Sequence, residues 1–532
     1  MCGILAVLRK SEQSISVEKI SEMSSRMSHR GPDERDVHVM ENGYVLCHER
    51  LSIVDLHTGK QPIQGTDTAW MVHNGEIYNH GDIRKMLSHH HWRSTSDSEA
   101  IVHLYEEYGY DICNMLHGIF AFVVVDGDKF IAGRDPIGVK PMYYGRLADG
   151  SICFASEMKA IEKECEDVAA FPPGHYYTPE DGFVQYFKPA WFDDKVCNRP
   201  LELDVLRDAL IESTRKRLMA DVPIGVLLSG GLDSSLTSAI AARLLAEQGK
   251  VLHSFSIGLD DNAPDAVAAK KVADFIGTKH HNIHFTVEQG IEIIDKLIWH
   301  LETYDVTSIR ASTPMYFLSK AITDMGIKVV LSGEGSDEIF GGYLYFYNAP
   351  SLEEFQKETI SRVQRLSTAD CLRADKSTMA HGLEARVPFL DKHFLQVAMR
   401  IAPEHKMPIK GQKVEKEILR QAFDDKENPW LPDEILWRQK EQFSDGVGYN
   451  WIDELMEYCS SQVSDEDMAK AAELFPHNTP DTKEAFFMRR IFHKHYPSDA
   501  AAHTVLKWIP KWQENKDPSG RANKVHEQTI EK

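Results

Sequence analysis

Between residues 203 and 331 the chain alternates short apolar runs with longer stretches whose apolar side chains recur at helical spacing. Four of the short runs are predicted to be strands: residues 224–228, 251–257, 282–285 and 327–331. Three stretches between them are predicted to be helices: residues 234–248, 264–276 and 288–302. Strands that alternate with helices build a parallel sheet with helices on both faces. This half is therefore predicted to be an α/β doubly wound domain, continuing from about residue 350 into a helix-rich C-terminal part.

The first 190 residues follow a different pattern, in which Gly, Pro, Asn and Asp interrupt short β-like runs. The clearest of these runs are residues 44–47, 70–73, 120–125 and 152–155. Helical spacing is found at residues 17–27 and 98–108. The pattern favours an α+β domain with antiparallel strands. Because residues 188–200 are typical of a linker, we expect one domain over residues 1–190 and a second over residues 200–532.

Charge and apolar content exclude several classes of partner. The 81 acidic and 60 basic residues give a formal net charge of −21, which argues against nucleic acid because phosphate binding needs local positive charge. No apolar run reaches the roughly 18 residues of a membrane helix, and the run at residues 4–8 is too short for a secretory signal. The eight cysteines form no CxxC pair. We therefore expect a cytoplasmic protein that binds neither membrane nor nucleic acid.

Two glycine-rich loops follow predicted strands in the second half. Residues 229–235 read SGGLDSS and open a helix, where glycines let the backbone approach an anion and the helix N-terminus offers N–H groups. Residues 331–338 read LSGEGSDE. Ligands of open α/β sheets bind at the carboxyl ends of strands, so both loops are expected to face one nucleotide. Asp233 and Asp337 are candidate Mg²⁺ ligands, and the alternative is that each only caps a helix.

Cys2 is the candidate nucleophile of the first half. Removal of Met1 would expose an α-amine with a pKa of roughly 7.7–8.0 beside a thiol with a pKa of roughly 8.5, so one residue would carry a nucleophile and its base. Asn74 and the Gly75 N–H are candidate oxyanion donors, although Asn-Gly is also typical of a type I′ hairpin turn. Arg50 is suited to grip an α-carboxylate.

Several longer motifs in the first half carry a family resemblance. Residues 29–33 (HRGPD), 48–55 (HERLSIVD), 74–79 (NGEIYN) and 134–138 (RDPIG) resemble the class II glutamine amidotransferases. The resemblance implies an N-terminal nucleophile (Ntn) αββα sandwich in which Cys2, Asn74 and Gly75 are catalytic. It implies that the following residues bind glutamine: Arg50, Leu51, Ser52, Ile53, Val54, Asn74, Gly75, Glu76 and Asp97.

The loop at residues 229–235 resembles the SGGxDS loop of ATP pyrophosphatases. With residues 302–314, 382–391 and 437–448, almost the whole chain resembles glutamine-hydrolysing asparagine synthetases. The resemblance implies that the following residues bind ATP: Leu228, Ser229, Gly230, Gly231, Asp233, Ser234, Ser235, Ile257, Ser332 and Gly333. It also implies that Glu334 sits beside an aspartyl-adenylate and that Arg310 neutralises charge at phosphorus. Lys440 would be a proton acceptor or a charge clamp.

The resemblance implies a complete reaction. L-aspartate and ATP would form β-aspartyl-AMP and diphosphate with Mg²⁺, and ammonia from L-glutamine would convert the adenylate into L-asparagine and AMP. It further implies a homodimer with a tunnel between its sites. The aspartate-binding residues stay open, because Glu384, Arg386 and Asp391 are equally suited to internal salt bridges.

Three other functions are weighed against this one. They are a β-lactam-synthetase-like enzyme that forms an intramolecular amide, a non-catalytic regulatory descendant, and a glutaminase whose second half only senses nucleotide. Cys2 disfavours the first, and the presence of Cys2, Arg50, Asp233 and Glu334 together disfavours the second. Asp233 and Asp337 disfavour the third. The run at residues 89–91 (HHH) is not expected to bind metal, because three consecutive side chains do not converge on one face of a helix or strand. A solvated turn is expected there.

Overall fold

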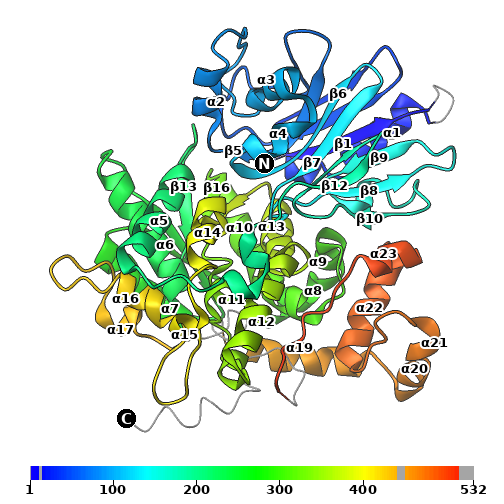
Figure 1. Ribbon diagram of the computed structural model, residues 1–532. Coiled ribbons are helices and arrows are strands. Elements are labelled where there is room, and N and C mark those ends of the chain that lie inside the picture. The colour runs from blue at the N-terminus through cyan, green and yellow to red at the C-terminus, as the bar shows by residue number, and fades with distance from the viewer. Residues whose placement is uncertain (1, 11–14, 440–447, 449, 514–532) are drawn as a thin grey trace.

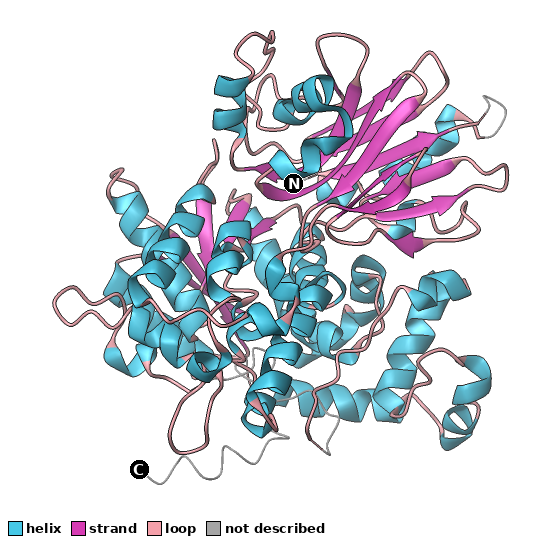
Figure 2. Ribbon diagram, viewed as in Figure 1, coloured by secondary structure: helices cyan, strands magenta, loops and turns pink. Residues whose placement is uncertain are grey.

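The computed structural model describes residues 2–10, 15–439, 448 and 450–513. Two antiparallel six-stranded sheets form the N-terminal domain, with strand orders β10-β8-β9-β1-β3-β2 and β12-β11-β7-β6-β5-β4 (Figures 1 and 2). The strands are β1 Gly3–Leu8, β2 Glu34–Val39, β3 Val45–Arg50, β4 Ile63–Gln64, β5 Trp70–Ile77, β6 Gly118–Asp126, β7 Lys129–Arg134, β8 Tyr143–Arg146, β9 Ile152–Ala155, β10 Ala169–Ala170, β11 His175–Thr178 and β12 Gly182–Gln185. The helices are α1 Val17–Ser25, α2 His80–Met86, α3 Glu99–Tyr108 and α4 Ile112–Met115.

Alternation of apolar side chains along the strands builds this domain as four layers. In β1, Ile4 and Ala6 belong to the core between the two sheets, whereas Leu5 and Val7 pack with Ile20 of α1. In β6, the side chains of residues 121, 123 and 125 enter the core between the sheets, and those of 120, 122 and 124 pack with the helices on the other side. Successive strand residues point to opposite faces of a sheet. Because both faces of β1 and β6 are covered, both strands are apolar throughout. The predicted αββα sandwich is confirmed.

The second domain is built on a parallel sheet of order β15-β14-β13-β16-β17. Its strands are β13 Ile224–Leu227, β14 His253–Gly258, β15 Lys279–His284, β16 Val329–Leu331 and β17 Glu384–Arg386. The helices up to β16 are α5 Leu203–Lys216, α6 Leu232–Ala246, α7 Pro264–Ile276, α8 Val287–Glu292, α9 Ile294–Leu301 and α10 Val306–Asp324. Helices α6 and α7 pack on one face and α10 on the other. The strand order reverses between β13 and β16, and ligands of such sheets bind in the crevice at this point.

The chain after β16 is mainly helical, as predicted. Its helices are α11 Ser336–Phe340, α12 Leu352–Arg365, α13 Asp370–Met379, α14 Lys392–Ala398, α15 Pro403–Lys406, α16 Glu417–Ala422, α17 Asp433–Leu436, α19 Asn450–Ser461, α20 Asp465–Ala469, α21 Ala471–Leu474, α22 Lys483–His495 and α23 Asp499–His503. In Figure 1, α19 to α23 lie together below and beside the N-terminal sandwich. Within the described ranges, no helix combines the length and apolarity needed to cross a bilayer.

Two sequence predictions differ from the structure. The helix predicted over residues 288–302 is two helices, because a capping box on Thr286 starts α8 early and α9 begins after Ile293. Strand β17 was not predicted, since two of its three residues are charged. It is nevertheless fully buried, because its charged side chains are paired with one another and with the N-terminal domain.

Candidate active sites

Cys2 lies at the start of the first strand, 7% exposed, between two segments of its own domain. Its backbone N–H donates to Asn74 Oδ1 at 3.0 Å, and its Sγ lies 3.9 Å from the carbonyl oxygen of Leu51. Burial raises the pKa of the Cys2 thiol. Asn74 and Gly75 lie inside β5 and pair with β6, so the hairpin-turn alternative is wrong. The predicted nucleophile and the predicted oxyanion donors are therefore neighbours.

The predicted glutamine-binding charges are also buried. Arg50 donates to Glu34 Oε2 at 2.5 Å and to the carbonyl oxygen of Asp55 at 2.6 Å. Asp97 accepts the N–H of Ile77 at 2.7 Å. Burial raises the pKa of Asp97, which holds back its ionisation where no cation is bound. An incoming ammonium group would favour the charged carboxylate.

Residues 51–54 join the predicted glutamine site to the second domain. Leu51 and Ile53 form an apolar cluster with Val329 of β16 and Met379 of α13, with Val54 packed against it. The carbonyl oxygen of Ile53 accepts the N–H of Asp221 at 3.0 Å. Ser52 N–H donates to Asp33 Oδ2 at 2.7 Å. The same segment that contacts Cys2 therefore packs on the parallel sheet.

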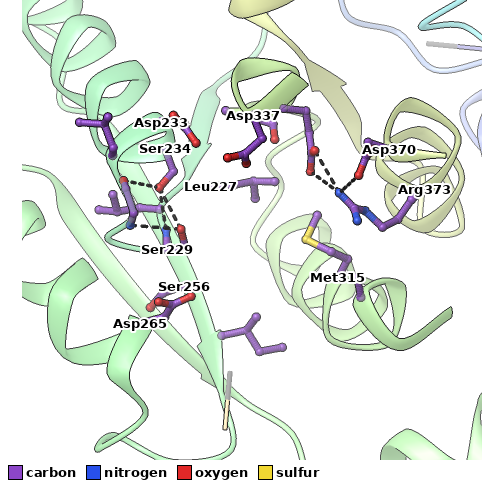
Figure 3. A pocket seen from close by; sticks show the side chains of 18 of the residues that line it. Leu227, Ser229, Asp233, Ser234, Ser256, Asp265, Met315, Asp337, Asp370 and Arg373 are labelled. Atoms are coloured by element: carbon purple, nitrogen blue, oxygen red, sulfur yellow. Dashed lines mark hydrogen bonds and ion pairs between the residues drawn. The ribbon is translucent and has the colours of Figure 1, made fainter. Parts of the chain in front are cut away.

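A cavity open to solvent lies at the carboxyl ends of β13, β14 and β16 (Figure 3). Ten of the predicted residues line it: Leu228, Ser229, Gly231, Asp233, Ser234, Ile257, Ser332, Gly333, Glu334 and Asp337. Gly230 and Ser235 are not among its lining residues, since Ser235 is buried in α6 and Gly230 turns the loop with φ +75°. The two glycine-rich loops thus face one space, as the strand order predicts.

The two loops touch at Gly333. A Cβ on Gly333 would lie 2.8 Å from the backbone nitrogen of Ser234 and 2.9 Å from Asp233 Cβ, closer than real Cβ atoms approach. Ser234 Oγ in turn accepts the N–H of Ser229 at 3.2 Å. Only a glycine lets the second loop close on the first turn of α6, where the free N–H groups lie.

Lys416 joins the two predicted metal ligands and was missed by sequence reasoning. Its Nζ lies 2.5 Å from Asp233 Oδ2 and 2.6 Å from Asp337 Oδ1, and its side chain is 2% exposed. The two carboxylates, one from each loop, therefore converge on a single cation. Asp233 Oδ1 is buried without a partner among the described residues. This donor set fits a divalent cation such as Mg²⁺, which prefers carboxylate oxygens. No pattern near Lys416 signals this contact, since 183 residues separate it from Asp233.

Glu334 is held by a second residue that sequence reasoning missed. Arg373 Nη2 lies 3.0 and 3.2 Å from the two carboxylate oxygens of Glu334 and 2.9 Å from Asp370 Oδ1 (Figure 3). All three residues line the cavity. The cavity therefore carries acidic groups on both sides and a guanidinium that is already shared by two of them.

One predicted residue lies elsewhere. Arg310 of α10 pairs with Glu484 of α22, with Nη2 2.5 Å from Oε2, and is not one of the cavity's lining residues. Both side chains are buried, at 4% and 6% exposure. Lys440 lies outside the described residues. Arg438, near Lys440 in sequence, lines the cavity 3.2 Å from Asp265 Oδ1.

Glu384, Arg386 and Asp391 were candidates either for aspartate binding or for internal salt bridges. The structure shows salt bridges. Arg386 Nε donates to Glu384 Oε1 at 2.5 Å, and Arg217 Nη1 donates to Asp391 Oδ2 at 3.0 Å. Asp391 also caps α14 through the N–H of His393 at 2.9 Å. None of the three lines the cavity.

Known families match both halves of the chain. Residues 1–182 match a family described as glutamine amidotransferase domain, and residues 205–356 and 350–516 match one described as asparagine synthase. Asparagine synthetase [glutamine-hydrolyzing] 2 of Oryza sativa subsp. japonica is 50% identical, covering 100% of this chain and 95% of the relative. Asparagine synthetase [glutamine-hydrolyzing] 3 of Arabidopsis thaliana is 51% identical, with 98% and 94% covered. A solved enzyme described as the allosteric regulatory enzyme of purine biosynthesis covers 53% of this chain and 80% of its own, at 16% identity and a TM-score of 0.32, too low to compare the folds. By these full-length matches the chain belongs to the family of glutamine-hydrolysing asparagine synthetases.

Proposed function

We propose that this chain makes L-asparagine from L-aspartate, using ammonia that it releases from L-glutamine and ATP that it converts to AMP and diphosphate. The observation that carries the proposal is the presence of two separate polar centres in one chain. One is Cys2 against Asn74, and the other is the cavity where two glycine-rich loops meet at the sheet's switch point. The first suits amide hydrolysis and the second suits nucleotide binding.

In the glutaminase site we assign the nucleophile to Cys2 after removal of Met1. The freed α-amine takes the thiol proton, and the thiolate attacks the glutamine amide carbon. The α-ammonium then passes that proton to the amide nitrogen, so that the C–N bond breaks, ammonia leaves and a thioester remains for water to cleave. Asn74 Oδ1 already accepts the Cys2 N–H, which leaves its Nδ2 and the Gly75 N–H as donors to the oxyanion. Arg50 would hold the α-carboxylate, and Asp97 with Glu76 the α-ammonium.

In the synthetase site we assign ATP to the two loops. Leu228 and Ile257 would contact the nucleoside, and Ser229 to Ser235 would place N–H groups against the phosphates. The aspartate β-carboxylate attacks the α-phosphorus and diphosphate leaves; ammonia then attacks the carbonyl carbon and AMP leaves. Asp233 and Asp337 would hold Mg²⁺, which would supply positive charge to the departing diphosphate. Glu334 would lie beside the adenylate, with Arg373 holding its carboxylate.

The proposal extends to Arg310, to Lys440, to the location of the chain and to its oligomeric state. Arg310 would reach charge at phosphorus only by giving up Glu484, and the role of Lys440 rests on the family resemblance alone. A cytoplasmic location is supported by the eight cysteines, all free in the structure, since a reducing compartment keeps thiols free. A homodimer rests on the family resemblance alone.

Product analysis tests the proposal. The chain is incubated with ATP, Mg²⁺, aspartate and glutamine, and asparagine, AMP and diphosphate are expected in equal amounts. An Asp233→Asn variant serves as a matched control, which should release glutamate from glutamine but form little asparagine. Formation of ADP instead of AMP would contradict the pyrophosphatase mechanism. Product formation that needs no ammonia source would favour the β-lactam-synthetase-like alternative.

A further inference from the structure

Three side chains of the N-terminal domain bring metal-ligating atoms together outside both proposed sites. His90 lies in the connection between α2 and α3, and His103 and Glu106 lie in α3 (Figure 1). One ligand atom of each lies within 4.8 Å of the other two. Glu106 Oε2 is 2.8 Å from His103 Nδ1 and 3.4 Å from His90 Nδ1. Ligand atoms around a tetrahedral zinc ion are about 3.3 Å apart, from bond lengths of about 2.0–2.2 Å.

The positions of the His89 and His90 side chains differ from those that the sequence predicts for residues 89–91. His89 Nε2 and His90 Nε2 both lie on Glu107 Oε1, at 3.0 and 2.9 Å. The expectation of a turn is confirmed, because residues 87–90 are neither helix nor strand. The expectation that the side chains do not converge is wrong for His89 and His90, because these residues lie in a turn and not on a helix or strand. His91 is exposed.

Each histidine of the cluster has a carboxylate on its other ring nitrogen. His103 Nε2 lies 3.4 Å from Glu99 Oε1, and His90 Nε2 lies 2.9 Å from Glu107 Oε1. Histidines that bind metals characteristically donate their second N–H to a carboxylate or carbonyl, which fixes the tautomer that leaves the ligating nitrogen unprotonated. Both imidazoles are therefore oriented with Nδ1 toward Glu106.

Glu106 is oriented in the same way. Its Oε1 accepts the backbone N–H groups of Thr66 and Asp67, at 2.5 and 3.1 Å, which leaves Oε2 toward the histidines. The Thr66 hydroxyl also lies 3.2 Å from His90 Nδ1. The side chains of His90, His103 and Glu106 are 7%, 1% and 10% exposed, so the ligand atoms are largely shielded from water.

The charges around the cluster favour a cation. Glu99, Glu106 and Glu107 supply three carboxylates, and Arg84 lies 3.8 Å from one oxygen of Glu99. We propose that His90 Nδ1, His103 Nδ1 and Glu106 Oε2 bind one divalent transition ion of the zinc class, with water as the fourth ligand. Two imidazoles and a carboxylate suit such an ion, whereas Mg²⁺ prefers oxygen ligands alone. The ion would fix the connection before α3 to the helix itself.

Metal binding by the full-length chain without a purification tag tests the proposal. The protein is stripped with a chelator, mixed with equimolar Zn²⁺ in excess Mg²⁺, and passed over a desalting column before its zinc content is measured. Excess Mg²⁺ occupies the carboxylate pair in the synthetase cavity. The variants are His90→Gln, His103→Gln and Glu106→Gln, and His91→Gln is the matched control. Co²⁺ in place of Zn²⁺ reports the ligand geometry by its visible absorption.

The proposal predicts one zinc per chain in the native protein and in His91→Gln, with affinity at least tenfold lower in the other three variants. Zinc should raise the melting temperature of the native protein and of His91→Gln but not of His90→Gln. The cobalt complex should show the intense bands of four-coordinate geometry without a thiolate band. A native protein that retains no zinc would overturn the proposal in favour of a proton shared between His103 and its two glutamates. Equal zinc retention by His90→Gln would also overturn it.

Discussion

Arg386 in the edge strand of the parallel sheet forms an ion pair with Glu76 of the N-terminal domain, with Nη2 3.0 Å from Oε1. Neither side chain is appreciably exposed. The carbonyl oxygen of Arg386 accepts the N–H of Ser332, which follows β16 in the second glycine-rich loop, at 2.8 Å. One residue thus contacts a predicted glutamine-binding side chain and the backbone of the predicted ATP site. Burial raises the pKa of Glu76 well above its usual range, and the Arg386 charge opposes that rise.

Replacement of Arg386 by Met should destabilise the protein strongly. The variant removes the buried cation that pairs with Glu76 and with Glu384, and breaking a buried pair in this way costs about 3–5 kcal/mol. Denaturant unfolding measures the change. Lys328→Met is the matched control, because the Lys328–Asp33 pair also joins the two domains but is 31% and 27% exposed. The free energy of unfolding of that control should fall by about 0–1 kcal/mol. Equal losses in the two variants would show that the Arg386 contact is no stronger than a surface pair.

Gly333→Ala should separate the two activities. The new Cβ would push the second loop away from the first turn of α6, since Ser234 N lies 2.8 Å from its position. Asparagine formation should fall about 100-fold, the scale expected when a reacting group is displaced by an ångström. Release of glutamate from glutamine should be unchanged. Gly81→Ala is the control, because a Cβ at Gly81 meets nothing within 4 Å. Unchanged asparagine formation in Gly333→Ala would contradict the contact between the loops.

Lys416→Gln should increase the response of the protein to Mg²⁺. Lys416 Nζ occupies the space between the Asp233 and Asp337 carboxylates, so its positive charge competes with a metal ion there. Without it, the two carboxylates repel each other until a cation binds. Thermal unfolding with and without MgCl₂ measures the effect, and the Mg²⁺-dependent rise in melting temperature should be larger in the variant. A smaller rise than in the native protein would mean that these carboxylates are not the magnesium ligands.

The N-terminal domain should lose stability as the pH falls through the histidine range. Burial lowers the pKa of His48 to about 3 and that of His73 to about 3. Both are neutral in either state at pH 7, and below about pH 6.5 only the unfolded chain takes up protons. The free energy of unfolding should therefore fall between pH 6.5 and pH 5, by up to about 1.4 kcal/mol per pH unit for each histidine.

Urea unfolding at several pH values measures this slope. His48→Gln should reduce the slope by one histidine's share, whereas His91→Gln, at an exposed position, should leave it as in the native protein. An unchanged slope in His48→Gln would show that His48 takes up its proton in the folded state as readily as in the unfolded state.

Local patterns in the sequence predicted most of the fold. The strands over residues 152–155 and 224–227 and the helix over residues 264–276 lie where apolar spacing, Gly and Pro place them. The SGGLDSS and SGEGSDE loops follow the ends of their strands and line one cavity, as the sequence predicts. These features are encoded by neighbours in sequence, which is why periodicity detects them.

Contacts between distant charged residues could not be predicted. Lys416 and Arg373 lie in the synthetase cavity because the helical C-terminal part folds back over the strand ends, and no local pattern distinguishes them from surface cations. Strand β17 is short and charged, so its burial depends on a partner in the other domain. Asn74-Gly75 has the composition of a turn, but pairing with β6 extends the strand through it.

The central claim is that glutamine hydrolysis and ATP-dependent amide formation take place at separate sites of one chain. Asparagine formation by a Cys2→Ala variant tests it most directly, measured once with glutamine and once with ammonium as the nitrogen source. The account predicts that the variant makes no asparagine with glutamine and retains the native rate with ammonium. Loss of both activities would contradict the claim, and so would full activity with glutamine.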